Sequence, residues 1–153
     1  GMGHDNPARS VCGLPDDPAG WTGAKRAGEK AFRMAGITID DVDACEIYDC
    51  FTYTVEATLQ DYGFFRPGEA EDWYRGGTTE PGGRMPVNTS GGLLAEAYFM
   101  GLTPFTEAVM QLMGRCGDRQ LGPATNTKEP EIILCSDNGG IFQSHACYLL
   151  RRP

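Results

Sequence analysis

Hydrophobic side chains recur every three or four residues in three stretches of the chain, which is the spacing of one face of an α-helix. The stretches span residues 24–35, 51–62 and 103–113. A glycine follows each, at Gly36, Gly63 and Gly114, and glycine readily takes the left-handed conformation that ends many helices. Thr103 is expected to cap the third helix, with Pro104 in its first turn. The pattern predicts three amphipathic helices, the first with an alanine-rich face suited to close packing.

Short apolar segments predict strands between and after these helices. They are residues 44–48, 131–135 and 145–150. The last two are separated by Asn138-Gly139-Gly140, which is a turn sequence. Residues 1–20 hold several prolines and glycines and no sustained apolar period, so we expect a loop there with at most one short strand near Val11. Helices that alternate with strands predict an α/β layered domain.

The segment from residue 64 to residue 87 interrupts this pattern, because glycine, proline and charged residues dominate it. A loop of this length in a compact domain is usually functional. Its acidic and aromatic composition favours a lid or a docking surface over a phosphate cradle. We therefore divide the chain into an N-terminal segment, residues 1–20, and a domain, residues 21–153, that carries this long loop.

Composition and charge narrow the classes of function. The length of 153 residues fits one domain, and the hydrophobic content of 41% is typical of a globular protein. No apolar run approaches the roughly twenty residues of a membrane span. Thirteen basic and twenty-one acidic side chains give a net charge of −8, which argues against nucleic acid and anionic lipid as partners. We expect a soluble protein that binds neither nucleic acid nor membranes.

The cysteines and the N-terminal sequence indicate the cellular compartment in which the protein is expected. Six cysteines form no CxxC pair and no regular framework, and His4 and His145 complete no zinc-binding spacing. We expect reduced thiols, a cytoplasmic location and no metal site. The N-terminus lacks the basic stretch and apolar core of a secretory signal, and Gly1 before Met2 is typical of a cloning scar.

Polar residues and glycines gather in three segments where chemistry is expected. The segments are residues 46–51, 86–98 and 135–140. Each lies where a strand gives way to a loop or helix, the usual place for a ligand in an open α/β sheet. In the second, Asn88 offers an amide, and Gly91 and Gly92 let backbone N–H groups approach a ligand before an expected helix start. This pattern suits an oxyanion hole, and a glycine turn with only a structural role is the alternative.

Several segments together resemble the C-terminal half of thiolases, in the sterol-carrier-protein-x and lipid-transfer-protein branch. They are Tyr-Asp-Cys-Phe at 48–51, Asn-Thr-Ser-Gly-Gly at 88–92, the helix end and acidic link at 35–43, and residues 107–114. The resemblance runs in consistent order from about residue 20 to the end. It implies a half-domain with a five-stranded mixed sheet covered by helices. It also implies a partner N-terminal thiolase half that supplies the nucleophilic cysteine.

Two positions depart from the thiolase pattern. Tyr48 stands where thiolases carry asparagine or histidine, and Tyr98 stands where they carry the histidine of a Gly-His-Pro sequence. A phenol with a pKa of about 10 donates a hydrogen bond but is a poor base at neutral pH, whereas a histidine at about 6.5 exchanges protons. The tyrosine pair therefore suits retro-aldol cleavage of a β-hydroxyacyl-CoA. One phenol takes the β-hydroxyl proton, and the other, with the glycine loop, stabilises the thioester enolate.

The resemblance also implies a substrate class and partners. Acyl-CoA is expected as the substrate, with a steroid or other lipid side chain as the acyl group and with no separate cofactor, and a small OB-fold protein is expected as a partner. A half-domain built to pack on a twin should expose an apolar face, so we expect a homo-oligomer. Cys135 lies near the place where many thiolases keep a second acid/base cysteine, with a buried strand-end role as the alternative. Asp49 is expected to cap the helix that opens at Phe51, with the orientation of a phenol as the alternative.

Two other functions stay open on the sequence. A conventional thiolase fragment that performs acyl transfer would need a surrogate for the missing histidine. A non-catalytic module that binds acyl-CoA or serves assembly would need no base, and either tyrosine alone could be a core residue with its hydroxyl bonded internally.

Overall fold

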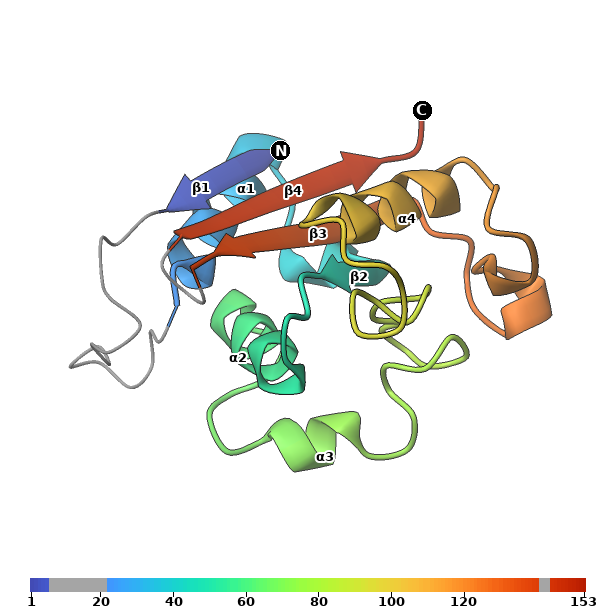
Figure 1. Ribbon diagram of the computed structural model, residues 1–153, viewed down its shortest axis with the longest axis horizontal. Helices are drawn as coiled ribbons and strands as arrows, with labels where there is room; N and C mark the ends of the chain where they lie inside the picture. The colour runs from blue at the N-terminus through green and yellow to red at the C-terminus, as the bar shows by residue number, and fades with distance from the viewer. Residues whose placement is uncertain (6–21, 141–143) are drawn as a thin grey trace.

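Four strands form a mixed sheet at the centre of the computed structural model, which describes residues 1–5, 22–140 and 144–153 (Figure 1). The strands are β1 (Met2–Asp5), β2 (Ala44–Ile47), β3 (Ile132–Gly139) and β4 (Ser144–Arg151). Their order in the sheet is β1-β4-β3-β2. The pairs β1–β4 and β4–β3 are antiparallel, whereas β3–β2 is parallel.

The sheet differs from the five-stranded expectation, because the described residues form four strands. Beside β2, the chain pairs with the sheet through a single bridge between Cys45 and Val87. It then turns at Asn88, whose φ of 52° ends any extended run. Residues 2–5 have no apolar alternation that would predict β1, and the strand expected near Val11 lies outside the described residues.

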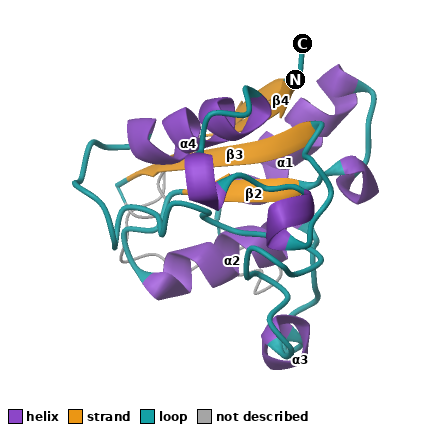
Figure 2. Cartoon of the chain, turned by 90° about the vertical axis from the view of Figure 1, so that its right-hand side faces the viewer, coloured by secondary structure: helices purple, strands orange, loops and turns teal. Residues whose placement is uncertain are grey.

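Helices cover both faces of the sheet (Figure 2). They are α1 (Ala24–Ala35), α2 (Thr52–Tyr62), α3 (Ala70–Tyr74) and α4 (Leu102–Leu112), with 3₁₀ helices η1 (Ile39–Asp41), η2 (Gly117–Arg119) and η3 (Pro123–Thr125). The helices α1 and α2 share a buried cluster with one face of β3 and β4, whereas α4 packs on the other face. The short helix α3 lies within the long loop, away from the sheet (Figure 1).

The three predicted helices are confirmed, with differences at their ends. Gly36 and Gly63 have φ values of 69° and 96° and end α1 and α2 as expected. The start of α4 is different, because Gly101 is its N-cap and no side chain caps it. Thr103 lies inside the helix and donates its hydroxyl to the Ala97 carbonyl at 3.4 Å. The predicted strands are confirmed, and β3 extends through Gly139.

Two sequence expectations can be compared with the described part of the chain. Its five cysteines, Cys45, Cys50, Cys116, Cys135 and Cys147, are free thiols, and Cys12 lies outside it. Among its helices, none has the length and apolar character needed to cross a bilayer.

Candidate active site

Strand β2 places Tyr48 at the edge of the buried core. The parallel pairing of β2 with β3 continues past Ile47, because the Tyr48 N–H donates to the Ser136 carbonyl at 2.9 Å. Alternate residues of a strand share a face, and Ala44 belongs to the cluster under α4. Tyr48 therefore lies on the α4 side of the sheet, with 8% of its surface exposed.

The segment that begins at Asn88 is tied to β2 by backbone and side-chain hydrogen bonds. The Asn88 N–H donates to the Cys45 carbonyl at 2.9 Å, and the Ile47 N–H donates to Asn88 Oδ1 at 2.6 Å. The amide oxygen of Asn88 thus accepts a hydrogen bond from the backbone of β2. This contact fixes the loop beside the residue that precedes Tyr48.

Gly92, the second glycine of the loop, makes room for Asp49. Gly91 and Gly92 have φ values of 94° and 69°, and a Cβ on Gly92 would meet the Asp49 carboxylate. That carboxylate accepts the Leu93 N–H at 2.7 Å and the Leu94 N–H at 3.4 Å. The expectation that Asp49 caps α2 is therefore wrong, because its carboxylate caps the turn after the glycines.

This capped turn also replaces the helix expected after Gly92. Residues 93–96 form turns, and α4 begins only at Leu102. The Gly91 N–H donates to the Asn88 carbonyl at 2.8 Å, and the Gly92 N–H lies 3.4 Å from Ser90 Oγ. The loop therefore has no helix dipole behind it, and its two glycine N–H groups make hydrogen bonds within the loop.

Tyr48 and Tyr98 meet across this site, although fifty positions separate them in the sequence. Their hydroxyl oxygens are 2.8 Å apart and share a hydrogen bond. Their rings meet edge to face, with centroids 6.5 Å apart and an interplanar angle of 80°. Burial raises the pKa of Tyr48 above its ordinary value, and the hydrogen bond with Tyr98 adds to that rise. Tyr98 is 62% exposed, so the pair joins a buried phenol to an accessible one.

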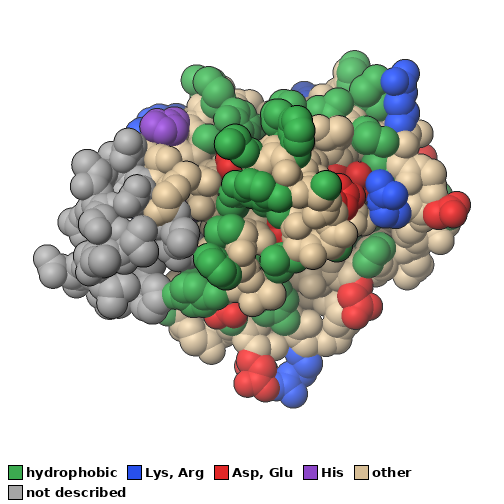
Figure 3. All heavy atoms as spheres, in the orientation of Figure 1, with side chains coloured by type: hydrophobic (Ala, Val, Ile, Leu, Met, Phe, Trp, Pro, Cys, Tyr) green, Lys and Arg blue, Asp and Glu red, His purple; other side chains and the backbone are tan. Residues whose placement is uncertain are grey.

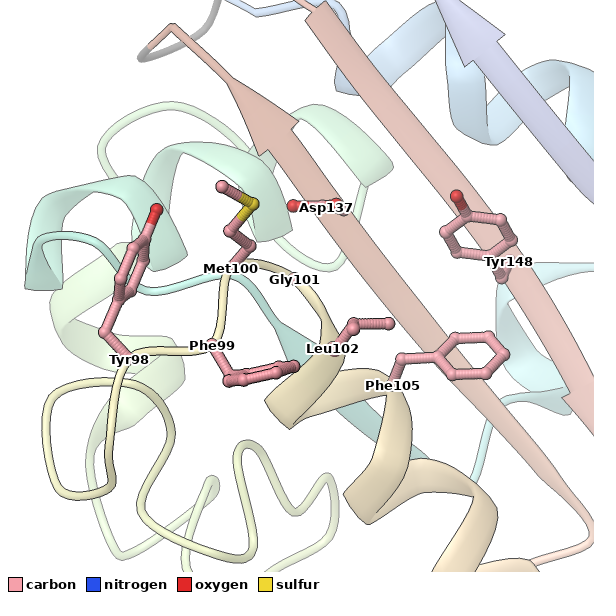
Figure 4. Close-up of a pocket in the computed structure, with 8 residues that line it drawn as sticks. All are labelled: Tyr98, Phe99, Met100, Gly101, Leu102, Phe105, Asp137 and Tyr148. Atoms are coloured by element: carbon pink, nitrogen blue, oxygen red, sulfur yellow. The ribbon is translucent and has the colours of Figure 1, made fainter.

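The accessible phenol lies at the border of two cavities. One, of about 700 Å³, is mostly apolar and is lined by Tyr98, Phe99, Met100, Gly101, Leu102, Phe105, Asp137 and Tyr148 (Figure 4). The other, of about 430 Å³, is lined by Tyr48, Tyr98 and His4 of β1, together with the end of β3 and the start of β4. Tyr98, Met100, Gly101 and Asp137 belong to both. A ligand would thus place a bulky apolar group in the first cavity and a polar reacting group in the adjacent second cavity.

Asp137 lies in the polar segment 135–140, but the sequence pattern does not single it out as a site residue. It projects from β3 toward Met100 (Figure 4), and a Cβ on Gly101 would meet its carboxylate. Burial raises the pKa of Asp137 above its ordinary value. The signal available in the sequence is a carboxylate at the end of an apolar strand, directly before Asn138 and two glycines.

The structure brings together only some of the residues expected to act. Tyr48 and Tyr98 share a hydrogen bond at the cavities, whereas Asn88, Gly91 and Gly92 line neither cavity and form the loop behind them. Cys135 is 1% exposed and packs with Ala108 and Leu112 of α4. Burial raises the pKa of its thiol well above the ordinary value, a surrounding that suits a core residue. The catalytic roles of these residues stay predictions.

The sequence matches the family described as "Thiolase C-terminal domain-like" over residues 9–152. This chain belongs to that family. Its mixed α/β fold is accordingly thiolase-like. Proteins similar to this chain carry the names of different reactions.

Two curated relatives and one solved structure illustrate the range of reactions named for similar proteins. The acetyl-CoA acetyltransferase of Methanothermobacter thermautotrophicus is 35% identical over 129 residues, which are 82% of this chain and 32% of that protein. The 17-hydroxy-3-oxo-4-pregnene-20-carboxyl-CoA lyase of Mycobacterium tuberculosis is 41% identical over 87 residues, 57% of this chain and 22% of that protein. The structure of an Ltp2-ChsH2(DUF35) aldolase superposes with a TM-score of 0.77 at 26% identity, covering 98% of this chain and 38% of the aldolase chain. This chain therefore spans less than two fifths of each.

Proposed function

We propose that this chain is the C-terminal part of a thiolase-like enzyme that cleaves the bond between the α- and β-carbons of a β-hydroxyacyl-CoA by a retro-aldol reaction. The observation that carries the proposal is the 2.8 Å hydrogen bond between the Tyr48 and Tyr98 hydroxyls beside a cavity. The lyase and the aldolase among its relatives support this reaction type. The acetyltransferase relative supports acyl transfer, but no feature of the tyrosine pair favours that reaction.

The two phenols have different tasks in this proposal. Because burial raises the pKa of Tyr48, Tyr48 stays protonated at neutral pH and donates its hydrogen bond to the Tyr98 oxygen. That donation stabilises the negative charge of a Tyr98 phenolate, which takes the proton of the substrate's β-hydroxyl and becomes neutral. The bond between the α- and β-carbons then breaks, so the β-carbon becomes a ketone and its electron pair enters the thioester enolate. The Tyr98 hydroxyl then returns this proton to the α-carbon, which releases a shorter acyl-CoA and restores the phenolate, so the reaction needs no co-reactant.

The larger cavity supports an apolar acyl group. Its volume of about 700 Å³ is in the range of sites for drug-sized ligands. Phe99, Leu102 and Phe105 supply apolar surface there, and Asp137 supplies one carboxylate. A steroid or similarly bulky lipid side chain fits this lining.

The coenzyme's phosphates require groups from elsewhere in this proposal. Among the described residues, neither cavity is lined by a lysine or an arginine, and the chain has a net charge of −8. We propose that an N-terminal thiolase half binds the phosphates and completes the site. The name of the Ltp2-ChsH2(DUF35) aldolase joins two components, which supports a partner protein for this chain as well.

The test is turnover by the complete protein that contains this chain. The substrate would be a β-hydroxyacyl-CoA with a bulky apolar side chain, and the ketone and the shorter acyl-CoA would be followed together. We expect Tyr98→Phe to lower kcat by about 10² to 10⁴, the usual contribution of a positioned acid or base, with Tyr48→Phe also impaired.

Tyr74→Phe is the matched control, because Tyr74 packs against Phe65 and Trp73 outside both cavities. Its turnover should equal that of the unchanged protein. Absence of both products, or turnover that Tyr98→Phe leaves unaltered, would refute the proposed reaction.

A further inference from the structure

A buried carboxyl of β2, that of Glu46, lies two residues before Tyr48 on the same face of the strand. The side chain is fully buried. Its Oε1 atom accepts the Thr89 N–H at 3.1 Å and lies 2.7 Å from Thr89 Oγ1. The same hydroxyl lies 2.9 Å from Glu107 Oε1 on α4. One threonine hydroxyl thus bridges two buried carboxyls.

Counting the hydrogens shows that this bridge needs an additional proton. Thr89 Oγ1 already accepts a hydrogen bond from Gln111 Nε2 at 3.0 Å. A hydroxyl has one hydrogen to donate and two lone pairs, so Thr89 can donate to only one of the carboxyls. The second short contact is a hydrogen bond only if the other carboxyl is protonated and donates to Thr89.

The surroundings of the two carboxyls differ in a way that locates this proton. Glu107 Oε2 accepts from Arg119 at 3.1 Å, and its Oε1 accepts from Gln111 Nε2 at 3.3 Å, which stabilises a charged carboxylate. Glu46 has no cation beside it, and its Oε2 has no hydrogen-bond partner in the part of the chain that the structure describes. A buried charge without such partners is costly.

We propose that Glu46 is a neutral carboxylic acid in the folded protein, that it donates through Thr89 to a charged Glu107, and that this relay is a positioning device for the tyrosine pair. The relay joins β2, which leads into Tyr48, to the loop at Thr89 and to α4, which begins just after the segment of Tyr98. The positioning role rests on the proposed function, whereas the protonation does not.

The electrostatics of the site agree with this assignment. Burial raises the pKa of Glu46 from 4.5 to about 8, the contacts with Thr89 oppose that rise, and repulsion from Glu107 and Asp49 adds to it. Other ionisable groups also interact with Glu46 or Glu107. They are Arg119 and Cys116 beyond α4, Cys135 on β3 and Cys45 on β2. Of these, Arg119 is the cation, and its hydrogen bond goes to Glu107.

Infrared spectroscopy of the complete protein without substrate tests the protonation directly. At about pH 6 we expect the absorption of a protonated carboxylic acid, lost in Glu46→Gln and kept in Asp137→Asn, which removes another carboxyl with a raised pKa. Glu29→Gln, an exposed position on α1, should also keep it. Absence of the band from the unchanged protein, or its loss in Glu107→Gln with retention in Glu46→Gln, would overturn the assignment.

The pH dependence of unfolding gives a second test, with a defined sign. Between pH 4.5 and about 8 the folded protein holds a proton on Glu46 that the unfolded chain has released. The Glu46 contribution to stability is therefore fully present below pH 4.5 and is lost as the pH rises toward 8. Relative to Glu46→Gln, the unfolding constant of the unchanged protein should rise by up to about tenfold per pH unit in that window. A constant ratio would contradict a raised pKa.

The positioning role is tested at Thr89. Thr89→Val removes the hydroxyl at nearly the same volume, so we expect the carboxylic acid band to shift and retro-aldol kcat to fall at least tenfold. Thr89→Ser keeps the hydroxyl and should restore both. Equal kcat in Thr89→Val and Thr89→Ser would refute positioning while leaving the infrared result standing, and an inactive unchanged protein would refute only the proposed function.

Discussion

At the scale of single residues, the contact between Gly92 and Asp49 determines the geometry of the candidate site. A side chain at Gly92 would meet the Asp49 carboxylate, which caps the turn through Leu93 and Leu94. Asp49 follows Tyr48 directly. Gly92 therefore fixes the position of the Tyr48 segment through its close approach to Asp49, a role different from donating an N–H group to a ligand.

This contact can be separated from backbone strain by comparing two glycines with the same φ of 69°. A Cβ on Gly36 meets nothing within 4 Å, so Gly36→Ala should cost about 1–2 kcal/mol from the left-handed conformation alone. Gly92→Ala carries the same strain and also the contact with Asp49. We expect a larger loss in the free energy of unfolding, measured by urea titration. Equal losses for the two variants would show that Asp49 moves aside freely.

The sequence predicts a site residue well where the type of that residue alone indicates its chemistry. Tyr48 and Tyr98 are expected as a pair, and the structure joins them by a hydrogen bond. The role of Asp49 is not predictable, because its partners, Leu93 and Leu94, lie far along the chain. Asp137 is missed for the same reason, since its importance arises from its approach to Gly101.

At the scale of elements, the alanine-rich face of α1 permits the close packing predicted for it. Gly28 lies against Tyr62 of α2, and a Cβ on Gly28 would be 2.7 Å from Tyr62 Cδ1. The Tyr62 hydroxyl also hydrogen-bonds to Ser136 Oγ at 2.6 Å. One aromatic side chain thus links α1, α2 and the centre of β3.

Gly28→Ala tests whether this packing outweighs helix propensity. Alanine normally stabilises a helix interior by about 0.5–1 kcal/mol relative to glycine. Here we expect a net loss of about 1–3 kcal/mol from overpacking against Tyr62. In a Tyr62→Leu background the loss should shrink or change sign, as a double-mutant cycle in thermal unfolding would show. A Gly28→Ala variant more stable than the unchanged protein would contradict the packing argument.

Periodicity predicts the elements with sustained patterns and fails for those set by distant partners. α1, α2, α4, β2, β3 and β4 each carry a local apolar period. β1 forms because residues 2–5 pair with β4, across most of the length of the chain. The helix expected after Gly92 is replaced by a turn whose Leu93 and Leu94 N–H groups donate to Asp49, a partner that no local period reveals.

At the scale of the whole molecule, apolar side chains gather over the start of α4 and the segment before it (Figure 3). The exposed members are Leu94, Tyr98, Phe99, Met100 and Leu102. Exposed apolar patches commonly mark interaction sites. All of these residues except Leu94 line the larger cavity, so a partner that covers the patch would also cover the candidate site.

The patch leads us to expect that this chain self-associates when expressed alone. Light scattering at rising concentration should show oligomers, and Phe99→Ser with Met100→Gln should shift the equilibrium toward monomer. Met34→Gln is the matched control, because Met34 on α1 is 69% exposed and Met100 is 70% exposed. A monomer at all concentrations, or an equal effect of the control, would contradict association through this patch.

The edges of the sheet restrict how such an assembly forms. The bridge from Cys45 to Val87 occupies part of the outer side of β2, and the opposite edge is β1, which is four residues long. Neither edge offers the long, flat row of unpaired backbone groups that recruits a strand from another molecule. Association should therefore leave the sheet content unchanged by circular dichroism, so that oligomers of this protein are distinguishable from β-sheet aggregates.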